Sequence, residues 1–175
     1  MKIKILFISL AFLFIQQVQS QESAKAMLDQ AYNQAKIENK NVFVLFTASW
    51  CGWCKKMDAN MNQASTKSLF DDNFVIVHLD VLERDNKKNL ETPGGLDFLK
   101  KHNAEKAGLP FFLIFDAYGK KLADSFNKKG QNLGCPATAE EVVEFSQLLK
   151  KSSTLSDEEL AVIAEVFQEK PKTGN

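Results

Sequence analysis

The sequence predicts one α/β domain built around a buried central sheet, and three observations support this prediction. Three β-prone runs, at residues 42–46, 74–80 and 111–115, are almost continuously apolar, which is typical of strands buried on both faces. Segments with helical periodicity lie between and after these runs. The length of 175 residues and the apolar content of 45% fit one folded domain.

The overall charge excludes one class of function. Lys and Arg together number 22, as do Asp and Glu, so the formal net charge is zero. A surface that binds nucleic acid needs an excess of basic residues to displace counterions, and we therefore expect no nucleic-acid partner. The 3 cysteines are too few to hold a domain of this size together by disulfides, so apolar packing must do so.

The start of the chain has the layout of a secretory signal peptide. Lys2 and Lys4 precede an apolar run at residues 5–15, and Val18 and Ser20 have the spacing of a cleavage site. The alternative, a membrane anchor, needs about 20 apolar residues to cross the bilayer, which is more than this run offers. We therefore expect an exported protein, periplasmic in preference to fully secreted.

This interpretation divides the chain into three parts. We expect a signal peptide at residues 1–20, a folded domain at residues 21–170 and a flexible tail at residues 171–175. Exported compartments tolerate disulfides, so cysteine chemistry is feasible there.

The first half of the predicted domain begins with a helix at residues 23–39, whose apolar side chains recur at helical spacing. The strand at residues 42–46 follows. A second helix is expected at residues 50–62 and a short one at residues 65–72, before the strand at residues 74–80.

The second half opens with a charged segment at residues 83–95, which ends in Thr-Pro-Gly-Gly and is expected to be a solvated loop. A helix is expected at residues 96–107. The strand at residues 111–115 begins directly after Pro110, and a turn leads to a more polar strand at residues 120–126.

Two helices with capping boxes complete the domain. Thr138 precedes Glu141 by three residues, and Ser156 precedes Glu159 by the same spacing. The second of these helices extends to about residue 169, and we expect it to pack against the rest of the domain.

The chemistry of the chain is expected at Cys51 and Cys54, which have C-x-x-C spacing at the start of the helix after the first strand. The amino end of a helix carries free N–H groups and a partial positive charge, so the pKa of a thiol at Cys51 should fall below the usual value of about 8.5. Cys54 lies about one turn further along, close enough for a disulfide.

Other uses of this cysteine pair are less well supported. A zinc site needs two more ligands, but Cys135 stands alone and His78 and His102 lack the spacing of paired ligands. Covalent haem attachment needs a histidine after the second cysteine, where this chain has Lys55. A purely structural disulfide stays open as an alternative. We therefore expect no metal and no organic cofactor, with the redox-active disulfide itself as the reactive group.

Two segments carry a resemblance to a known family. Residues 46–57, Phe-Thr-Ala-Ser-Trp-Cys-Gly-Trp-Cys-Lys-Lys-Met, resemble the active-site segment of the thioredoxin superfamily. Residues 108–116 resemble its second signature, in which a cis-proline opens a strand, and residues 118–120 resemble the turn that follows. The likeness spans about residues 22–151 and is to exported bacterial thioredoxin-like thiol–disulfide interchange proteins. It implies a thioredoxin fold for residues 21–170: a central mixed β-sheet flanked by helices, here with an extra C-terminal helix.

The resemblance implies a role for each cysteine and for its neighbours. Cys51 would attack a substrate disulfide, and Cys54 would resolve the mixed disulfide that forms. Trp50, Gly52 and Trp53 would flank the reactive pair, and the tryptophan at Trp50 would limit access of solvent. Trp53 stands where ordinary thioredoxins carry a proline between the cysteines.

The second signature implies a place for the substrate. Pro110, in its cis form, would lie beside Cys51. The backbone of Leu109 would then be free to pair with an extended substrate peptide, as an edge strand does. An ordinary trans proline at the start of a strand is the alternative.

One position departs from the family pattern. Leu45 stands where thioredoxins carry a buried acid that moves protons for the second cysteine. His78, in the next strand, is the candidate for proton transfer, because imidazole titrates near neutral pH. A histidine that is merely hydrogen-bonded is the alternative. Glu38 and Asp58 are further possibilities on proximity in sequence alone.

The third cysteine, Cys135, falls in an expected loop before a capped helix. We expect a partly buried thiol without a role, because free cysteines often behave as small apolar residues. A regulatory or dimer-forming thiol is the alternative.

Together these features predict a thiol–disulfide oxidoreductase, with reduction as the preferred direction. Its partners would be proteins with disulfides or thiols, and a reductase in exported space would also need a membrane electron-transfer partner. The alternative is a redox-inert module that binds a peptide or partner and carries a structural Cys51–Cys54 disulfide. Leu45 in place of the acid favours that alternative slightly.

Overall fold

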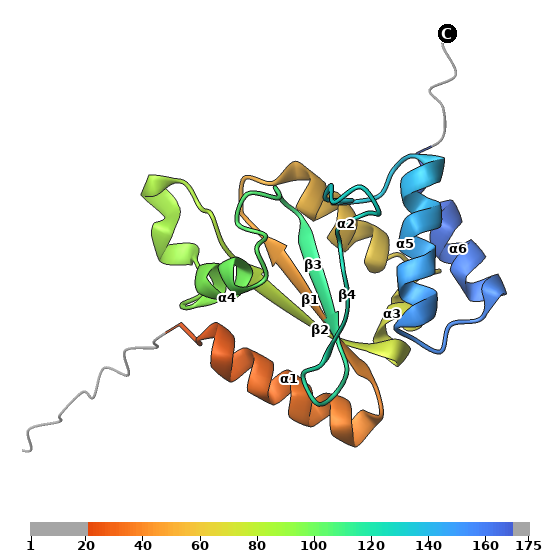
Figure 1. Ribbon diagram of the computed structural model, residues 1–175, viewed down its shortest axis with the longest axis horizontal. Coiled ribbons are helices and arrows are strands. Elements are labelled where there is room, and N and C mark those ends of the chain that lie inside the picture. Colours follow the sequence, from red (N-terminus) through yellow and green to blue (C-terminus); the bar gives the residue numbers. More distant parts are fainter. Residues whose placement is uncertain (1–20, 170–175) are drawn as a thin grey trace, which may run out of the picture.

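The computed structural model describes residues 21–169, which form a central sheet with helices on both faces (Figure 1). The expected signal peptide and the expected tail lie outside these residues. In chain order the elements are α1 (Ala24–Glu38), β1 (Asn41–Thr47), α2 (Gly52–Met61), α3 (Lys67–Asn73), β2 (Phe74–Asp80), the 3₁₀-helix η1 (Asp85–Leu90), α4 (Gly95–Lys101), β3 (Phe111–Phe115), β4 (Lys121–Asp124), α5 (Ala139–Lys151) and α6 (Asp157–Phe167).

The sheet has the strand order β2-β1-β3-β4. β1 is parallel to β2 and antiparallel to β3, and β3 is antiparallel to β4. Because of these directions, the end of β1 lies beside the end of β2 and the start of β3. Thr47 pairs with Asp80, and Phe46 pairs with Phe111. The segments that follow β1 and β2 therefore meet the segment that precedes β3 at one edge of the sheet.

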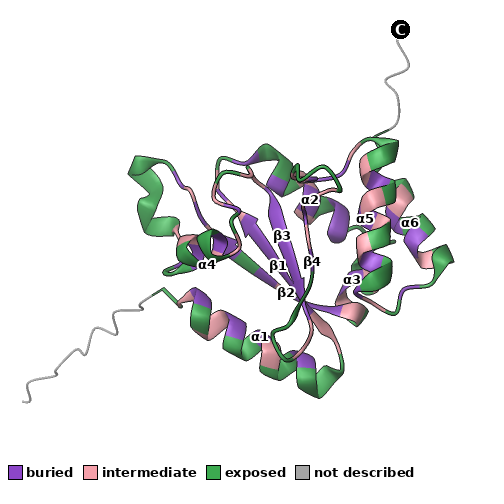
Figure 2. Cartoon of the chain, viewed as in Figure 1, coloured by how far each residue is buried: buried purple, intermediate pink, exposed green. Residues whose placement is uncertain are grey.

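Alternation along the strands builds two apolar layers, because successive side chains of a strand point to opposite faces. In β1, Val42, Val44 and Phe46 pack with the apolar sides of α1 and α4. Phe43 and Leu45 face the other way, into a layer formed with α2, α3, α5 and α6. Figure 2 shows the result, with the central strands β1 and β3 buried and the outer sides of the helices exposed. The predicted α/β class and mixed sheet are confirmed.

The extra C-terminal helix belongs to the second layer. Phe167 of α6 packs against Phe145 of α5 and Phe70 of α3, with ring centroids 5.1 and 6.2 Å apart. Both predicted capping boxes are present, with Thr138 and Ser156 as the N-caps of α5 and α6. The expectation that the last helix packs against the domain is confirmed.

The segment at residues 83–95 is exposed over most of its length, as predicted, but it is not a plain loop. It contains η1, which begins with Asp85 in its first turn, where an acidic side chain is favourable. Glu83 is also buried, at 3% exposure, because it accepts hydrogen bonds from another loop. The charge of this segment suggested solvent, but charge alone does not reveal a partner that lies far away in the sequence.

Two predicted boundaries also need correction. The helix expected at residues 96–107 ends at Lys101, because His102 caps it and Asn103 follows with φ of 57°. The strand expected at residues 120–126 is shorter and spans Lys121–Asp124. Within residues 21–169, no helix has the length and apolar character needed to span a membrane.

Candidate active site

Cys51 and Cys54 lie at the amino end of α2, where the chain leaves the sheet edge described above. Cys51 is the N-cap of α2, and its Sγ accepts a hydrogen bond from the N–H of Cys54 at 3.1 Å. The two residues form a disulfide, with Cα atoms 5.3 Å apart. When the disulfide is reduced, the same N–H groups and the helix dipole face the sulfur of Cys51, and this arrangement favours its thiolate.

Two exposed tryptophans lie next to the buried disulfide. Cys51 and Cys54 are 3% and 2% exposed, whereas Trp50 and Trp53 are 44% and 49% exposed. The Nε1–H of Trp50 donates to the carbonyl of Leu82 at 2.9 Å. The Nζ of Lys56 lies 5.0 Å from the centroid of the Trp53 ring, a cation–π distance. The indoles are thus held beside the disulfide.

Leu109 and Pro110 complete this side of the site. The Leu109–Pro110 peptide bond is cis, as the resemblance implied. Leu109 packs against Ala48 and the two cysteines. Among the residues that the structure describes, the backbone N–H and C=O of Leu109 have no hydrogen-bond partner. We call Trp50, Trp53 and Leu109 the front rim.

Gly52 is the first residue of α2. A Cβ added to it would meet no other atom within 4 Å, so the surface of the protein is open at this point. The predicted flanking residues Trp50, Gly52 and Trp53 are therefore exposed next to the covered disulfide, against which Leu109 also packs.

Asn132 fastens the segment that carries Pro110, a role for which no sequence pattern was a guide. Its Nδ2 donates to the carbonyls of Gly108 and Pro110, at 3.2 and 2.9 Å. Its Oδ1 accepts from the hydroxyl of Ser125 at 2.7 Å and from the N–H of Gly134 at 2.9 Å. One amide thus joins three parts of the chain behind the front rim.

Glu83 fastens the segment that precedes Cys51. Its carboxylate accepts from the N–H of Ser49 at 2.5 Å and from the Ser49 hydroxyl at 2.9 Å. The neighbouring Leu82 accepts from Trp50, and the guanidinium of Arg84 lies 5.9 Å from the centroid of the Trp50 ring. The segment after β2 therefore holds the loop after β1 in place through these contacts. A usable signal existed in the sequence, because an acid just beyond a buried parallel strand falls at this sheet edge.

Burial and charge affect one more acid at this edge. Burial raises the pKa of the Asp80 carboxyl, and the nearby negative charge of Glu83 adds to the effect. The hydroxyl oxygen of Thr92 accepts a hydrogen bond from the backbone N–H of Asp80 at 3.0 Å.

A small pocket lies behind Cys54. It has a volume of about 310 Å³ and is lined by Leu45, Thr47, Cys54, Lys55, Asp58 and His78, and we call it the back pocket. Leu45 and His78 are register partners on β1 and β2. The Nε2 of His78 lies 3.0 Å from Oδ1 of Asp58, and both side chains are about half exposed.

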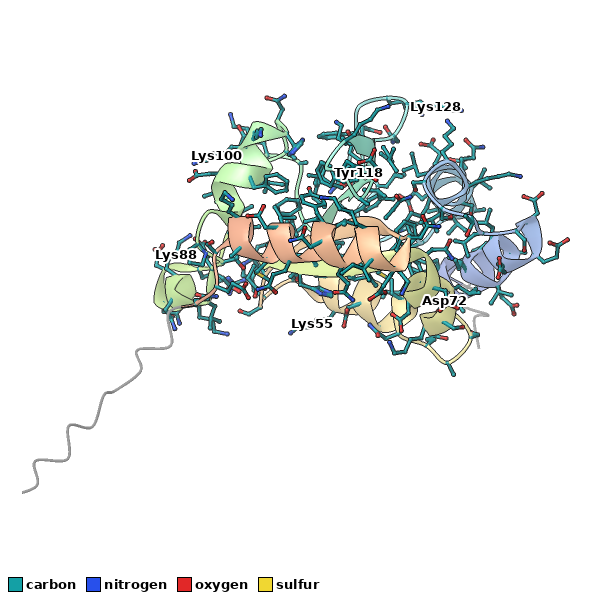
Figure 3. All side chains as sticks on the ribbon, turned by 90° about the horizontal axis from the view of Figure 1, so that it is seen from below. Lys55, Asp72, Lys88, Lys100, Tyr118 and Lys128 are labelled. Carbon is teal, nitrogen blue, oxygen red and sulfur yellow. A yellow bond between two sulfur atoms is a disulfide. The ribbon has the colours of Figure 1, made fainter. Side chains whose placement is uncertain are left out.

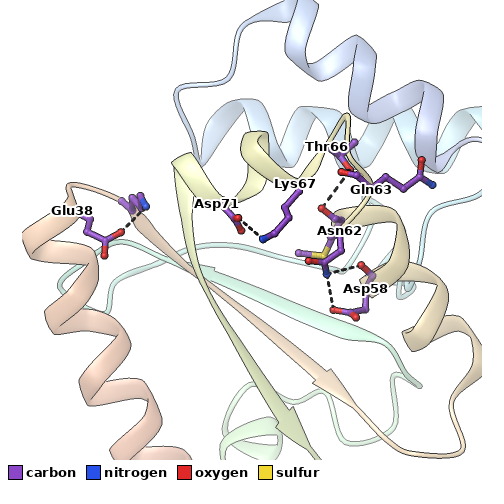
Figure 4. Close-up of polar contacts among 9 residues, drawn as sticks. Glu38, Asp58, Asn62, Gln63, Thr66, Lys67 and Asp71 are labelled. Atoms are coloured by element: carbon purple, nitrogen blue, oxygen red, sulfur yellow. Dashed lines mark hydrogen bonds and ion pairs between the residues drawn. The ribbon is translucent and has the colours of Figure 1, made fainter.

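The structure separates the further acids considered for proton transfer. Asp58 reaches the back pocket, and its Oδ1 also accepts from the Nδ2 of Asn62 at 3.2 Å (Figure 4). Glu38 lies at the end of α1, before β1 begins, and so at the opposite end of that strand from the cysteines. Hydrogen bonds from Lys40 and Gln34 lower the pKa of Glu38 there. Glu38 is therefore not part of the site.

Cys135 is a free, buried thiol. Burial raises its pKa to about 11, so it stays protonated at neutral pH. It lines a groove of about 450 Å³ together with Trp53 and Pro110. Within residues 21–169, no cluster of three or more His, Cys, Asp or Glu side chains is arranged to hold a metal ion.

Comparison with known proteins identifies the relatives of this arrangement. A family model described as thioredoxin-like matches residues 23–117. A disulphide isomerase from Xylella fastidiosa Temecula1 has a similar structure, with a TM-score of 0.51 and 16% identity over 86% of this chain and 93% of that one. A thioredoxin from Thermus thermophilus has a TM-score of 0.47 and 18% identity, over 71% of this chain and 85% of that one. No match was found among curated protein sequences.

Proposed function

As a member of the thioredoxin-like family with a C-x-x-C disulfide, this chain is an oxidoreductase, and we propose that it reduces disulfides in other proteins. The observation that carries this proposal is the position of Cys51. It caps α2 with its sulfur, is joined to Cys54, and packs against Leu109 in the segment that leads into β3. The reducing direction rests on the likeness of residues 46–57 to thioredoxin-type motifs.

The reaction proceeds by two exchanges. The Cys51 thiolate attacks one sulfur of a substrate disulfide, a bond forms between Cys51 and that sulfur, and the other substrate sulfur leaves as a thiolate. The Cys54 thiolate then attacks Cys51, which re-forms the Cys51–Cys54 disulfide and releases the substrate as a dithiol. Two electrons pass from the protein to the substrate. An external dithiol must then reduce Cys51 and Cys54 again.

The second exchange needs a proton acceptor, since Cys54 must lose its proton to attack. We assign this task to His78, held by Asp58 in the back pocket. Leu45, at the position of the acid in thioredoxins, is fully buried and cannot take a proton. Water in the back pocket would bridge the thiol and the imidazole.

The front rim suits an extended substrate segment. The unpaired N–H and C=O of Leu109 can form two backbone hydrogen bonds with it, and Trp50 and Trp53 offer apolar contact on both sides of its cysteine. Binding of this kind depends more on the backbone of the substrate than on its side chains, so we expect several protein substrates.

The place of action follows from the expected signal peptide. We propose that the protein works in exported space, in the periplasm in preference to the medium, and that a membrane electron-transfer protein reduces it there. The reduced state would need such a partner because cytoplasmic reductants do not reach that compartment.

A second candidate function is supported by the coverage of the disulfide. With Cys51 and Cys54 only 3% and 2% exposed, the pair could be a fixed disulfide in a module that binds a peptide at the front rim. The two functions differ in whether the disulfide exchanges with thiols.

The deciding experiment is the equilibrium redox potential of the pair in dithiothreitol or glutathione buffers, read by the fluorescence of Trp50 and Trp53. A potential near about −270 mV supports a reductant, and one near about −120 mV supports an oxidant instead. A disulfide that never equilibrates favours the binding module. Cys54→Ser should trap mixed disulfides with substrates, whereas Cys51→Ser should trap none and should abolish turnover.

A further inference from the structure

A groove runs between α1 and α4 on the sheet face opposite α2. Its volume is about 780 Å³, within the range of about 300–1,000 Å³ that is usual for sites of small molecules. Figure 3 looks onto α1, with α4, which carries Lys100, to one side and the turn at Tyr118 above it. The groove is lined by neither of the two cysteines.

The floor of the groove is aromatic. Four rings from three parts of the chain, α1, α4 and β3, meet there: Tyr32, Phe98, His102 and Phe115. The ring centroids of Tyr32 and Phe115 are 6.1 Å apart, and those of Phe98 and His102 are 4.9 Å apart. His102 also meets Phe115 edge-on at 5.6 Å. Apolar surface left open in a groove favours an apolar occupant, because covering it removes that surface from water.

Some of the charged side chains that line the groove have an ion-pair partner and others have none. Of the lining carboxylates, Asp29 pairs with Lys25 at 2.5 Å, and Asp97 pairs with Lys100 at 3.6 Å. Lys101 also lines the groove, but it has no ion-pair partner among residues 21–169. Of the two lysines that line the groove, Lys101 is thus the one without an ion-pair partner in the described residues, and its ammonium group can complement an anion.

Two neutral polar groups lie in the same groove. The Tyr32 hydroxyl and the His102 ring have no hydrogen-bond partner within the described part of the chain. Burial, with the charges of Asp116 and Asp29, raises the pKa of Tyr32 to about 12. Burial and the charges of Lys121 and Lys101 lower the pKa of His102, against the opposing effect of Asp124. Both groups are thus uncharged at neutral pH and can hydrogen-bond a ligand.

We propose that the groove between α1 and α4 binds a small apolar anion, such as an aromatic or fatty carboxylate. The apolar body of the ligand lies on the aromatic floor, and its anionic group faces Lys101. This site is separate from the disulfide and does not depend on the proposed reductase activity.

A matched pair of fluorescent probes tests the proposal in the full chain. 1-Anilinonaphthalene-8-sulfonate is an apolar anion, and N-phenyl-1-naphthylamine is its uncharged counterpart. We expect the anion to bind at one site per chain. Lys101→Gln should weaken its binding by about threefold to fivefold, as is usual for one exposed ion pair, and should leave binding of the neutral probe unchanged. Lys106→Gln, an exposed lysine outside the groove, is the control.

Amide chemical shifts of the unaltered chain locate the site without relying on any variant. Shifts confined to α1, α4 and the turn at Gly119 support the proposal. The proposal fails if the anion does not bind, if its shifts gather at the front rim, or if Lys101→Gln and Lys106→Gln have equal effects. Probe binding that disappears as the chain dimerises, measured by sedimentation, would instead show that a second copy covers the groove.

Discussion

The front rim and the back pocket lie on two sides of one disulfide and differ in almost every property. The front rim is apolar, and Glu83 and Asn132 fix the residues next to it through hydrogen bonds to Ser49 and Pro110. The back pocket is polar, and its His78–Asp58 pair is about half exposed to water. Under the proposed function, separate parts of the chain would recognise the substrate and move the proton. Variants should therefore affect one without the other.

The largest effect is expected at Glu83. Glu83→Ala removes a buried carboxylate and leaves the N–H of Ser49 without its acceptor, so we expect the free energy of unfolding to fall by about 3 kcal/mol. The rate of the first exchange should fall as well, because the loop before Cys51 loses its anchor. Urea unfolding and stopped-flow kinetics measure the two effects.

The exposed Glu165→Ala on α6 serves as the control for Glu83. It should change neither quantity, since the exposed side chain of Glu165 makes no hydrogen bond or ion pair in the described part of the chain. Glu83→Gln keeps one acceptor for Ser49 and should cost about half as much. A Glu83→Ala protein with normal kinetics would show that the front rim does not depend on this anchor.

A smaller effect is expected at Asn132. Asn132→Asp keeps the oxygen that accepts from Ser125 and Gly134 but removes the N–H groups that hold the carbonyls of Gly108 and Pro110. We expect a loss of about 1–2 kcal/mol in stability and a higher KM for a disulfide-containing peptide. Asn127→Asp is the matched control, because Asn127 uses only its oxygen. Equal KM values for the two variants would remove Asn132 from the front rim.

Substitution of His78 in the back pocket should change the rate of the second exchange alone. His78→Gln should slow release of the mixed disulfide by about tenfold, less than the hundredfold or more typical of general acid–base catalysis, because water also reaches this pocket. The first exchange and the stability should change little. Added imidazole should restore the rate of release, and His102→Gln should need no rescue. An unchanged rate of release in His78→Gln would leave this histidine without a role in the reaction.

The smallest effect is expected at Cys135. Its raised pKa means that the folded state prefers the neutral thiol, so its contribution to stability is present below the usual thiol pKa and is lost as the pH rises through about 11. At pH 7 we expect iodoacetamide to alkylate Cys135 slowly, as measured by mass spectrometry. The rate of thiol–disulfide exchange should be unchanged in Cys135→Ala. Rapid alkylation at pH 7 would contradict burial of this thiol.

Local patterns predicted most of the fold and the cysteine pair that forms the disulfide. The three buried runs became β1, β2 and β3, because continuous β-prone residues leave few alternatives in a covered sheet. Cys51 and Cys54 were found because a motif and a helix start coincide within a few residues. Both capping boxes were found for the same reason.

The remaining site residues depend on contacts between distant parts of the chain. The sequence signal for Glu83 was only its place just beyond a buried strand, and Asn132 had none. Glu83 lies 34 residues from Ser49, and Asn132 lies 22 residues from Pro110. Their roles appear only when β1, β2 and β3 bring the loops to one edge. The burial of Glu83 in this mostly exposed segment was missed for this reason, since a charged residue beside a distant N–H has the same sequence pattern as one in water.

The burial of Cys135 has a consequence for how the chain acquires its disulfide. An unfolded chain with three thiols can close a short loop between Cys51 and Cys54 or a much longer one to Cys135, and the entropy of chain closure favours the short loop. Once folded, the third thiol lies in the apolar layer with Phe145 and is withheld from oxidants. Non-native disulfides that include Cys135 are therefore disfavoured twice. The entropy of chain closure disfavours them in the unfolded chain, and the burial of Cys135 disfavours them in the folded one.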